Sequence, residues 1–141
     1  MAARAAVIAE ALSFVGTPYH PNARIKGVGV DCAMLLAEVY ANAGVVPHID
    51  PGEYAADFAL HHSDEIFLEW LARYATETET PRAGDVACFK FGHCYSHGAI
   101  LTDDDGGLVH AMNREGAVVR SRVGDGFLNG RAVKYFTLWE S

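Results

Sequence analysis

The chain has 141 residues and a mass of 15.2 kDa, and half of its residues are apolar, which is enough for one soluble domain with its own core. Its formal net charge is −7 with only 11 lysines and arginines, so a basic surface for nucleic acid or for an anionic membrane is not expected. A run of about 18 apolar residues, as a membrane-spanning helix requires, is absent from the sequence.

The first element expected is a helix over Ala5–Val15, with an apolar stripe formed by Ala5, Ile8, Leu12 and Val15. Glu10 interrupts the apolar run, so we expect this segment to be a helix of the domain and not a signal peptide. Gly16 and Pro18 end the helix. The Pro- and Gly-rich stretch Thr17–Val30 that follows predicts a loop.

A second helix is predicted directly after this loop. Apolar residues recur at helical spacing from Cys32 to Ala43, and Gly44 stands where a glycine commonly ends a helix. Asp31 is the expected N-cap, which places Cys32 at the first helical position. Unpaired backbone N–H groups at a helix N-terminus favour the thiolate, the nucleophilic form of cysteine. The alternative is that Cys32 is only the first core-facing residue of its helix.

The second half of the chain reads as β-structure. The stretch Val45–His62 is irregular, and Ser63 is the expected cap of a further helix whose apolar face holds Phe67, Trp70, Leu71 and Tyr74. Strands are then predicted at Asp85–Phe91, His97–Thr102, Leu108–Met112, Ala117–Val123 and Ala132–Trp139. Turn sequences between them favour an antiparallel meander. We therefore expect one α+β domain over residues 1–141, with N-terminal helices packed on an antiparallel sheet.

Two histidines lie on strands on either side of one predicted turn, and a cysteine nucleophile needs a base and often a group that orients the base. If the turn is Asp103–Gly106, His110 opposes Ala99 and shares a face with His97. If the turn is one residue longer, Asn113 opposes His97 instead, so Asn113 is the reserve candidate for the orienting residue. The alternative for each histidine is a hydrogen-bonded imidazole of the core or surface.

A metal site is a competing interpretation of the same region. Cys88, His93, Cys94 and His97 lie within ten positions, but there is no Cys-x-x-Cys pair, and Cys88 and His93 fit no common ligand spacing. We expect no metal ion and no organic cofactor. Three cysteines also argue against a disulfide framework, and we expect Cys88 and Cys94 to be structural or incidental.

In chain order, the segments FVGTPY, GVGVDCAMLL, PRAGDVACF, SHGAIL and LVHAM resemble the NlpC/P60 family of papain-like cysteine peptidases. The resemblance covers nearly the whole chain. It implies that Cys32 is the nucleophile, His97 the general base and His110 the residue that orients His97. It also implies that Tyr19 helps to bind the developing oxyanion with the Cys32 backbone N–H, and Asp31 is assigned to the same oxyanion and substrate side of the site.

The resemblance further implies hydrolysis of bacterial peptidoglycan stem peptides, at the bond between γ-D-glutamyl and a diamino acid. The stretch Tyr54–Leu71 looks like the phage-encoded branch of the family, which implies phage tail proteins as partners. The expected location is then a phage virion tail or the cytoplasm of a prophage-bearing host. Val30 departs from that branch, in which a second cysteine often precedes the aspartate. Three alternatives stay open: a thiol amidase or acyltransferase on the same fold, a structural tail component, and a small metal-binding module.

Overall fold

The computed structural model of the chain describes residues 4–21, 23–47 and 71–139. Helices come first and most of the strands later, which confirms the predicted α+β class. The predicted irregular stretch after residue 47 and most of the helix expected after Ser63 lie outside the described residues. The elements are α1 (Arg4–Ser13), β1 (Arg24–Ile25), β2 (Gly29–Val30), α2 (Cys32–Asn42), β3 (Thr76–Thr78), β4 (Val86–Phe91), β5 (Cys94–Leu101), β6 (Gly107–Met112), β7 (Ala117–Arg122), the 3-10 turn η1 (Gly126–Leu128) and β8 (Val133–Thr137).

Helix α1 buries a different face from the predicted one. Val7, Ala11 and Phe14 are almost fully buried, whereas Leu12 and Val15 of the predicted stripe are 37% and 43% exposed. The buried residues follow the same helical spacing but are rotated around the axis. The helix contains many alanines and other small residues, so its composition specifies the buried face only weakly, and contact with α2 and β5 decides it.

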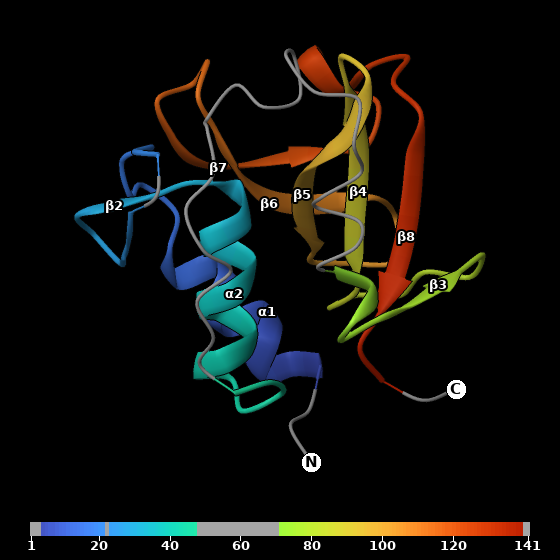
Figure 1. The fold of residues 1–141 in the computed structure, drawn as a ribbon, viewed down its shortest axis with the longest axis horizontal. Coiled ribbons are helices and arrows are strands. Elements are labelled where there is room, and N and C mark those ends of the chain that lie inside the picture. Colours follow the sequence, from blue (N-terminus) through green and yellow to red (C-terminus); the bar gives the residue numbers. More distant parts are fainter. Residues whose placement is uncertain (1–3, 22, 48–70, 140–141) are drawn as a thin grey trace.

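Helix α2 begins and ends as the sequence predicts. The Asp31 carboxylate accepts a hydrogen bond from the Met34 N–H at 2.9 Å, which is the expected N-cap. Gly44 has a φ of +81°, a conformation that glycine adopts without strain, and the chain leaves the helix there. The helix is buried on most of its circumference. It therefore packs against β5 and β6 and also against α1, which lies behind its lower half in Figure 1.

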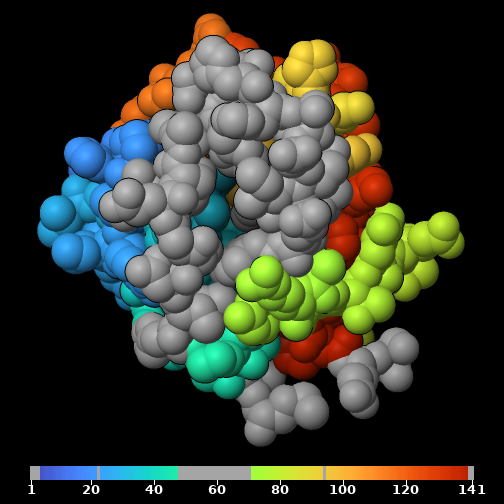
Figure 2. All heavy atoms as spheres, in the orientation of Figure 1, coloured from blue at the N-terminus to red at the C-terminus, as the bar shows by residue number. Residues whose placement is uncertain are grey.

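The sheet is six-stranded and antiparallel, with the order β3-β8-β4-β5-β6-β7. The predicted meander is correct for β4 to β7 but wrong for the last strand. β8 returns to the opposite side of the sheet and pairs with β4, and the polar strand β3, which the sequence did not predict, pairs with β8. The loop predicted at Thr17–Val30 also contains the short hairpin β1–β2. This hairpin and β3 protrude on opposite sides of the face drawn in Figure 2.

Alternation along the strands divides the core in two. In β4, Val86 and Cys88 belong to the cluster that packs against the helices, whereas Ala87 and Phe89 belong to a second cluster on the other face. Leu128 of η1 closes that second cluster. Among the described residues, no helix is long and apolar enough to cross a membrane.

Strand β5 is irregular at the position where the candidate site lies. Phe89 of β4 pairs with His97, but Lys90 pairs with Tyr95, so Ser96 is an extra residue and forms a β-bulge. Bulges bend a strand and re-aim its side chains. On its other edge β5 pairs with β6 at Ile100 and Leu101, and residues 94–99 continue alongside β4.

Candidate active site

Cys32 is the first residue of α2, as predicted, and is partly buried. Its sulfur lies 3.6 Å from the carbonyl oxygen of Ser96, and the backbone N–H of Gly98 is among the groups that lower the pKa of the thiol. A carbonyl and the N–H two residues later point to the same edge of a strand. The sulfur therefore lies beside the backbone of residues 96–98 of β5, next to His97.

The predicted effect of the helix start on Cys32 is present, but other effects outweigh it. Burial and the neighbouring Asp31 carboxylate raise the pKa of the Cys32 thiol to about 12. Backbone N–H groups, including that of Ala33, lower the pKa as the helix position predicts, but they do not offset the other two effects. Cys32 is consequently a neutral thiol at neutral pH, and its proton must be removed when it reacts.

His97 and His110 lie next to each other in the core, with His97 Nε2 2.8 Å from His110 Nδ1. The rings are edge to face, with centroids 5.0 Å apart. The shorter of the two predicted turns is the one formed, because Thr102 N–H donates to Gly107 C=O and Ile100 pairs with Val109. This register places His110 opposite Ala99 and confirms that the two histidines share a face.

The electrostatics of the pair favour neutral imidazoles. Burial lowers the pKa of His97 to about 3, with further contributions from His110 and Arg131, and burial lowers the pKa of His110 to about 4. Within the described part of the chain, His97 Nδ1 has no hydrogen-bond partner. A neutral imidazole with a free ring nitrogen beside the backbone that holds a thiol is a suitable general base.

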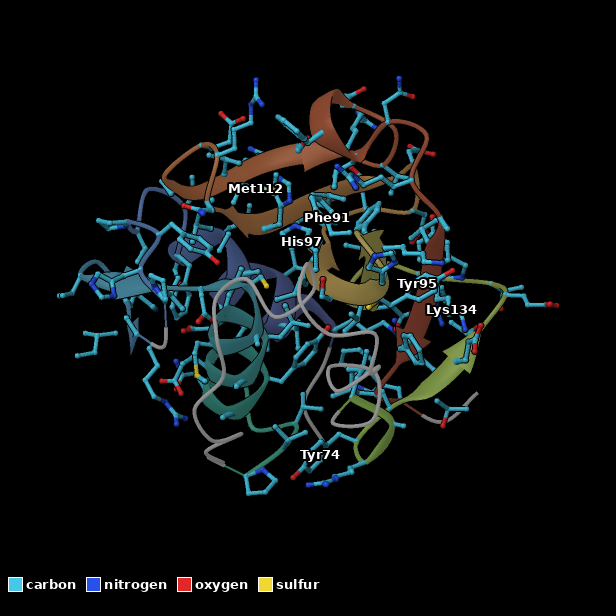
Figure 3. The ribbon with its side chains drawn as sticks, turned by 45° about the horizontal axis from the view of Figure 1, so that its top comes forward. Tyr74, Phe91, Tyr95, His97, Met112 and Lys134 are labelled. Carbon is cyan, nitrogen blue, oxygen red and sulfur yellow. The ribbon has the colours of Figure 1, made fainter. Side chains whose placement is uncertain are left out.

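Sequence reasoning missed two residues near His97: Phe91, which contacts its ring, and Arg131, which acts on it through its charge. The Phe91 ring packs against the His97 ring with centroids 5.1 Å apart, and Figure 3 shows the two side by side. The Arg131 guanidinium lies over the Phe91 ring, with its Cζ 3.7 Å from the ring centroid. Arg131 Nε also donates a hydrogen bond to the carbonyl of Phe127 at 2.6 Å. Arg131 precedes β8, so no local pattern connects it with β5. Only the pairing of β8 with β4 brings it near the site.

Tyr19 lies close to Cys32, as the resemblance implies. Pro18 C=O accepts from Val30 N–H, and Tyr19 N–H donates to Gly116 C=O, so the loop is held between β2 and β7. Burial raises the pKa of Tyr19, as do the negative charges of Cys32 in its thiolate form and Asp31. The phenol thus keeps its proton and remains a hydrogen-bond donor.

The reserve candidate is not brought to the site. Asn113 is exposed in the turn after β6, because the register that would have set it opposite His97 is not formed. Of the four residues in the competing metal interpretation, Cys94 has a side chain that lies outside the described residues. Cys88 points into the cluster that faces the helices, His93 is exposed in a turn, and no three metal-ligating side chains of the described residues gather in one place.

Comparison with known proteins shows that the fold of this chain is similar to the folds of several solved structures. No protein-family model matches the chain, and no curated protein does either. Among solved structures, the NlpC/p60 domain of the peptidoglycan hydrolase SagA is 23% identical and has a TM-score of 0.63, with 94% of this chain and 97% of that one covered. The P60 domain of an antigen from M. avium subspecies paratuberculosis is 20% identical, covers 98% and 96%, and has a TM-score of 0.62.

The peptidoglycan hydrolase RipB of Mycobacterium tuberculosis is 19% identical and has a TM-score of 0.61, with 98% of this chain and 65% of that one covered. The fold of the described residues is therefore that of NlpC/P60 domains, as the order of helices and strands already indicated.

Proposed function

We propose that this protein is a cysteine peptidase that hydrolyses stem peptides of bacterial peptidoglycan. The observation that carries the proposal is the position of Cys32. Its sulfur lies 3.6 Å from the carbonyl oxygen of Ser96, the residue before His97. His97 Nε2 is engaged by His110, and its Nδ1 is free to take a proton. Shared fold with peptidoglycan hydrolases supports the choice of substrate.

The reaction begins with a neutral thiol and a neutral imidazole. His97 Nδ1 takes the proton of Cys32 as the sulfur attacks the peptide carbonyl carbon, and the carbonyl oxygen becomes an oxyanion. The Cys32 backbone N–H and the Tyr19 hydroxyl donate to that oxyanion. Donors of this kind contribute roughly 3–4 kcal/mol each in well-studied enzymes. Deprotonation only during attack is consistent with the raised pKa of Cys32.

The second half restores the enzyme. The C–N bond breaks, the leaving amine takes the proton from His97, and a thioester on Cys32 remains. Water then gives a proton to His97 and attacks the thioester carbon. The C–S bond breaks, the proton returns to the sulfur, and the new carboxylic acid leaves. His110 keeps the His97 ring in one orientation throughout, and neither step uses a metal ion.

The test is digestion of purified peptidoglycan under reducing conditions by the wild-type, Cys32→Ala and Cys32→Ser proteins, with mass spectrometry of the released fragments. Wild type should release stem-peptide fragments and both variants should not. We expect the fragment masses to place the cut between γ-D-glutamyl and the diamino acid. Circular dichroism of the variants shows whether their fold is intact.

Other outcomes have definite meanings. A transferred acyl group in place of a free carboxylate would identify an acyltransferase, and loss of ammonia from an intact peptide would identify an amidase. No fragments together with an unreactive Cys32 thiol would reject the enzyme and favour a structural component.

The proposal also includes association with a phage tail, for which the support is the sequence of residues 54–71 alone. These residues lie outside the described part of the chain. Detection of the protein by mass spectrometry in purified virions, at a fixed ratio to a tail protein, is the expected result. Its absence from virions that carry all other tail proteins would reject the tail location and leave the peptidase proposal intact.

A further inference from the structure

Two lysines and a tyrosine form a cluster across three neighbouring strands, on the face of the sheet against which the helices pack. Tyr95 of β5 is paired with Lys90 of β4, and Lys134 of β8 is paired with Cys88, which belongs to the core cluster on the helix side. The Lys134 ammonium lies 4.9 Å and the Lys90 ammonium 5.9 Å from the centre of the Tyr95 ring. Figure 3 shows Tyr95 and Lys134 next to each other. We call Lys90, Tyr95 and Lys134 the lysine cluster.

The lysine cluster adjoins the candidate active site. Tyr95 directly precedes Ser96, whose carbonyl oxygen is 3.6 Å from the Cys32 sulfur. Helix α2, which begins at Cys32, packs against β5 and β6. β4 and β8, which carry the two lysines, follow β5 on the side away from β6 (Figure 1). The cluster therefore lies beside the nucleophile, on the same face of the sheet as the helix that carries it.

Neither lysine of the cluster has an acidic partner in the described part of the chain. The ion pairs found there involve other cations, namely Arg4, Arg24 and Lys26. Lys90 is exposed and Lys134 partly exposed, so both can meet a ligand. Two like charges near one ring repel each other, and an exposed aromatic face returns only about 0.5–1 kcal/mol per cation. An anion that binds to both ammonium groups removes this repulsion.

The proposed substrate carries the complementary charge. A glutamyl residue that is linked through its γ-carboxyl group keeps a free α-carboxylate on one side of the scissile bond, and the leaving peptide ends in a carboxylate on the other side. An ammonium group is a compact positive charge with three donors, and hydrogen bonds between two charged groups are the strong ones. The charge of the cluster and its position beside Cys32 therefore both fit a carboxylate of the peptide.

We propose that the lysine cluster is a substrate subsite, in which Lys90 and Lys134 donate to a carboxylate of the stem peptide while Cys32 attacks the scissile carbonyl. The inference rests on the proposed function and names the group of the substrate that is recognised. The Tyr95 ring holds the two lysine side chains over the sheet.

Alkylation of Cys32 tests the cluster without any peptide substrate. Iodoacetate and iodoacetamide alkylate a thiol by the same displacement of iodide, but only iodoacetate carries a carboxylate. Loss of thiolate slows both reagents equally, so the ratio of the two rates reports how well a small carboxylate is received beside Cys32. Lys90→Gln and Lys134→Gln should each lower this ratio by about two- to fivefold at low ionic strength. Mass spectrometry of the Cys32 peptide separates this thiol from the other two cysteines.

Lys26→Gln is the matched control for the loss of one positive charge. Lys26 is paired with Glu10 and lies over the Phe14 ring, away from the lysine cluster. This variant should keep the rate ratio of the wild type. An equal fall in all three variants would assign the effect to net charge and overturn the proposal, as would an unchanged ratio in Lys90→Gln and Lys134→Gln.

Synthetic stem peptides identify which carboxylate is bound. The wild type is given the peptide with both carboxylates free, the peptide with an amide at the γ-D-glutamyl α-carboxyl group, and the peptide with an amide at its C-terminus. One of the two amides should raise KM at least fivefold and thereby name the carboxylate. The same amide should have little effect on a Lys90→Gln/Lys134→Gln double variant, because the partners of the carboxylate are already missing. Equal KM values for all three peptides in the wild type would overturn the proposal.

Failure of the proposed function has a different result. If the wild type cleaves none of the peptides, the peptidase proposal fails and the substrate assignment fails with it. The rate ratio of the two alkylating reagents still decides whether the lysine cluster receives a carboxylate beside Cys32. Cleavage of the peptides with an unchanged ratio and equal KM values would leave the peptidase proposal intact and reject the subsite alone.

Discussion

Asp31 caps helix α2 by accepting a hydrogen bond from Met34 N–H at 2.9 Å, with its carboxylate almost fully buried one residue before Cys32. The same group thus performs two opposed tasks. It satisfies one of the free N–H groups at the helix start, which stabilises the helix. Its negative charge also raises the pKa of the neighbouring thiol, which keeps Cys32 protonated.

Asp31→Asn separates these two tasks. Asparagine caps helices about as well as aspartate, so the free energy of unfolding should change by less than about 1 kcal/mol. Because the negative charge is lost, the pKa of Cys32 should fall and alkylation by iodoacetamide at pH 8 should become faster. Asp31→Ala is the control for the cap and should destabilise the protein by about 1–2 kcal/mol. A slower or unchanged alkylation rate in a folded Asp31→Asn protein would contradict the electrostatic assignment.

His110 is expected to act as a positioning residue through the hydrogen bond to His97. His110→Ala should lower the rate of Cys32 alkylation and of peptidoglycan hydrolysis by about 5- to 150-fold, since a lost buried hydrogen bond costs about 1–3 kcal/mol. In His110→Asn the side-chain oxygen can accept from His97 Nε2 in place of Nδ1, so most of the rate should return. A higher KM with an unchanged kcat would reject the positioning role.

Acid should destabilise the protein through the same pair. The pKa of His97 is lowered from 6.5 to about 3 and that of His110 to about 4, so the unfolded chain binds protons that the folded protein does not. The stabilisation is fully present above pH 6.5 and is lost as the pH falls towards 3. Each histidine contributes a slope of at most about 1.4 kcal/mol per pH unit to the free energy of unfolding. Urea unfolding of wild type and a His97→Asn/His110→Asn double variant should converge at low pH, and parallel curves would be inconsistent with the lowered values.

Arg131 should influence His97 by its charge as well as through Phe91. The guanidinium contributes to the low pKa of His97, so Arg131→Gln should raise that pKa, as followed by NMR titration of the imidazole. Loss of the bonds from a charged donor to the Phe127 and Lys90 carbonyls should also cost about 2 kcal/mol of stability. Lys134→Gln is the matched control, because Lys134 lies over Tyr95. If both substitutions changed the pKa of His97 equally, the overall positive charge of the protein, and not the position of Arg131, would account for the effect.

Local sequence signals determined much of the molecule. Asp31 and Gly44 define the ends of α2 because capping depends on residues within one helical turn. The turn that begins at Asp103 defines the register of β5 and β6, because the Asp103 carboxylate accepts from the N–H groups of Asp105 and Gly107. With that register, the strand period of two places His97 and His110 on one face.

Only the tertiary structure decided those features that require segments far apart in the chain to come together. The place of β8 beside β4, the buried face of α1 and the contact of Arg131 with Phe91 follow from packing between elements, which no local pattern encodes. The protonation of Cys32 is the clearest case. The sequence correctly predicted its position at the helix start, where backbone dipoles favour the thiolate. Only the folded protein adds the burial that outweighs them, because removing a charge from water costs more than a few partial charges return.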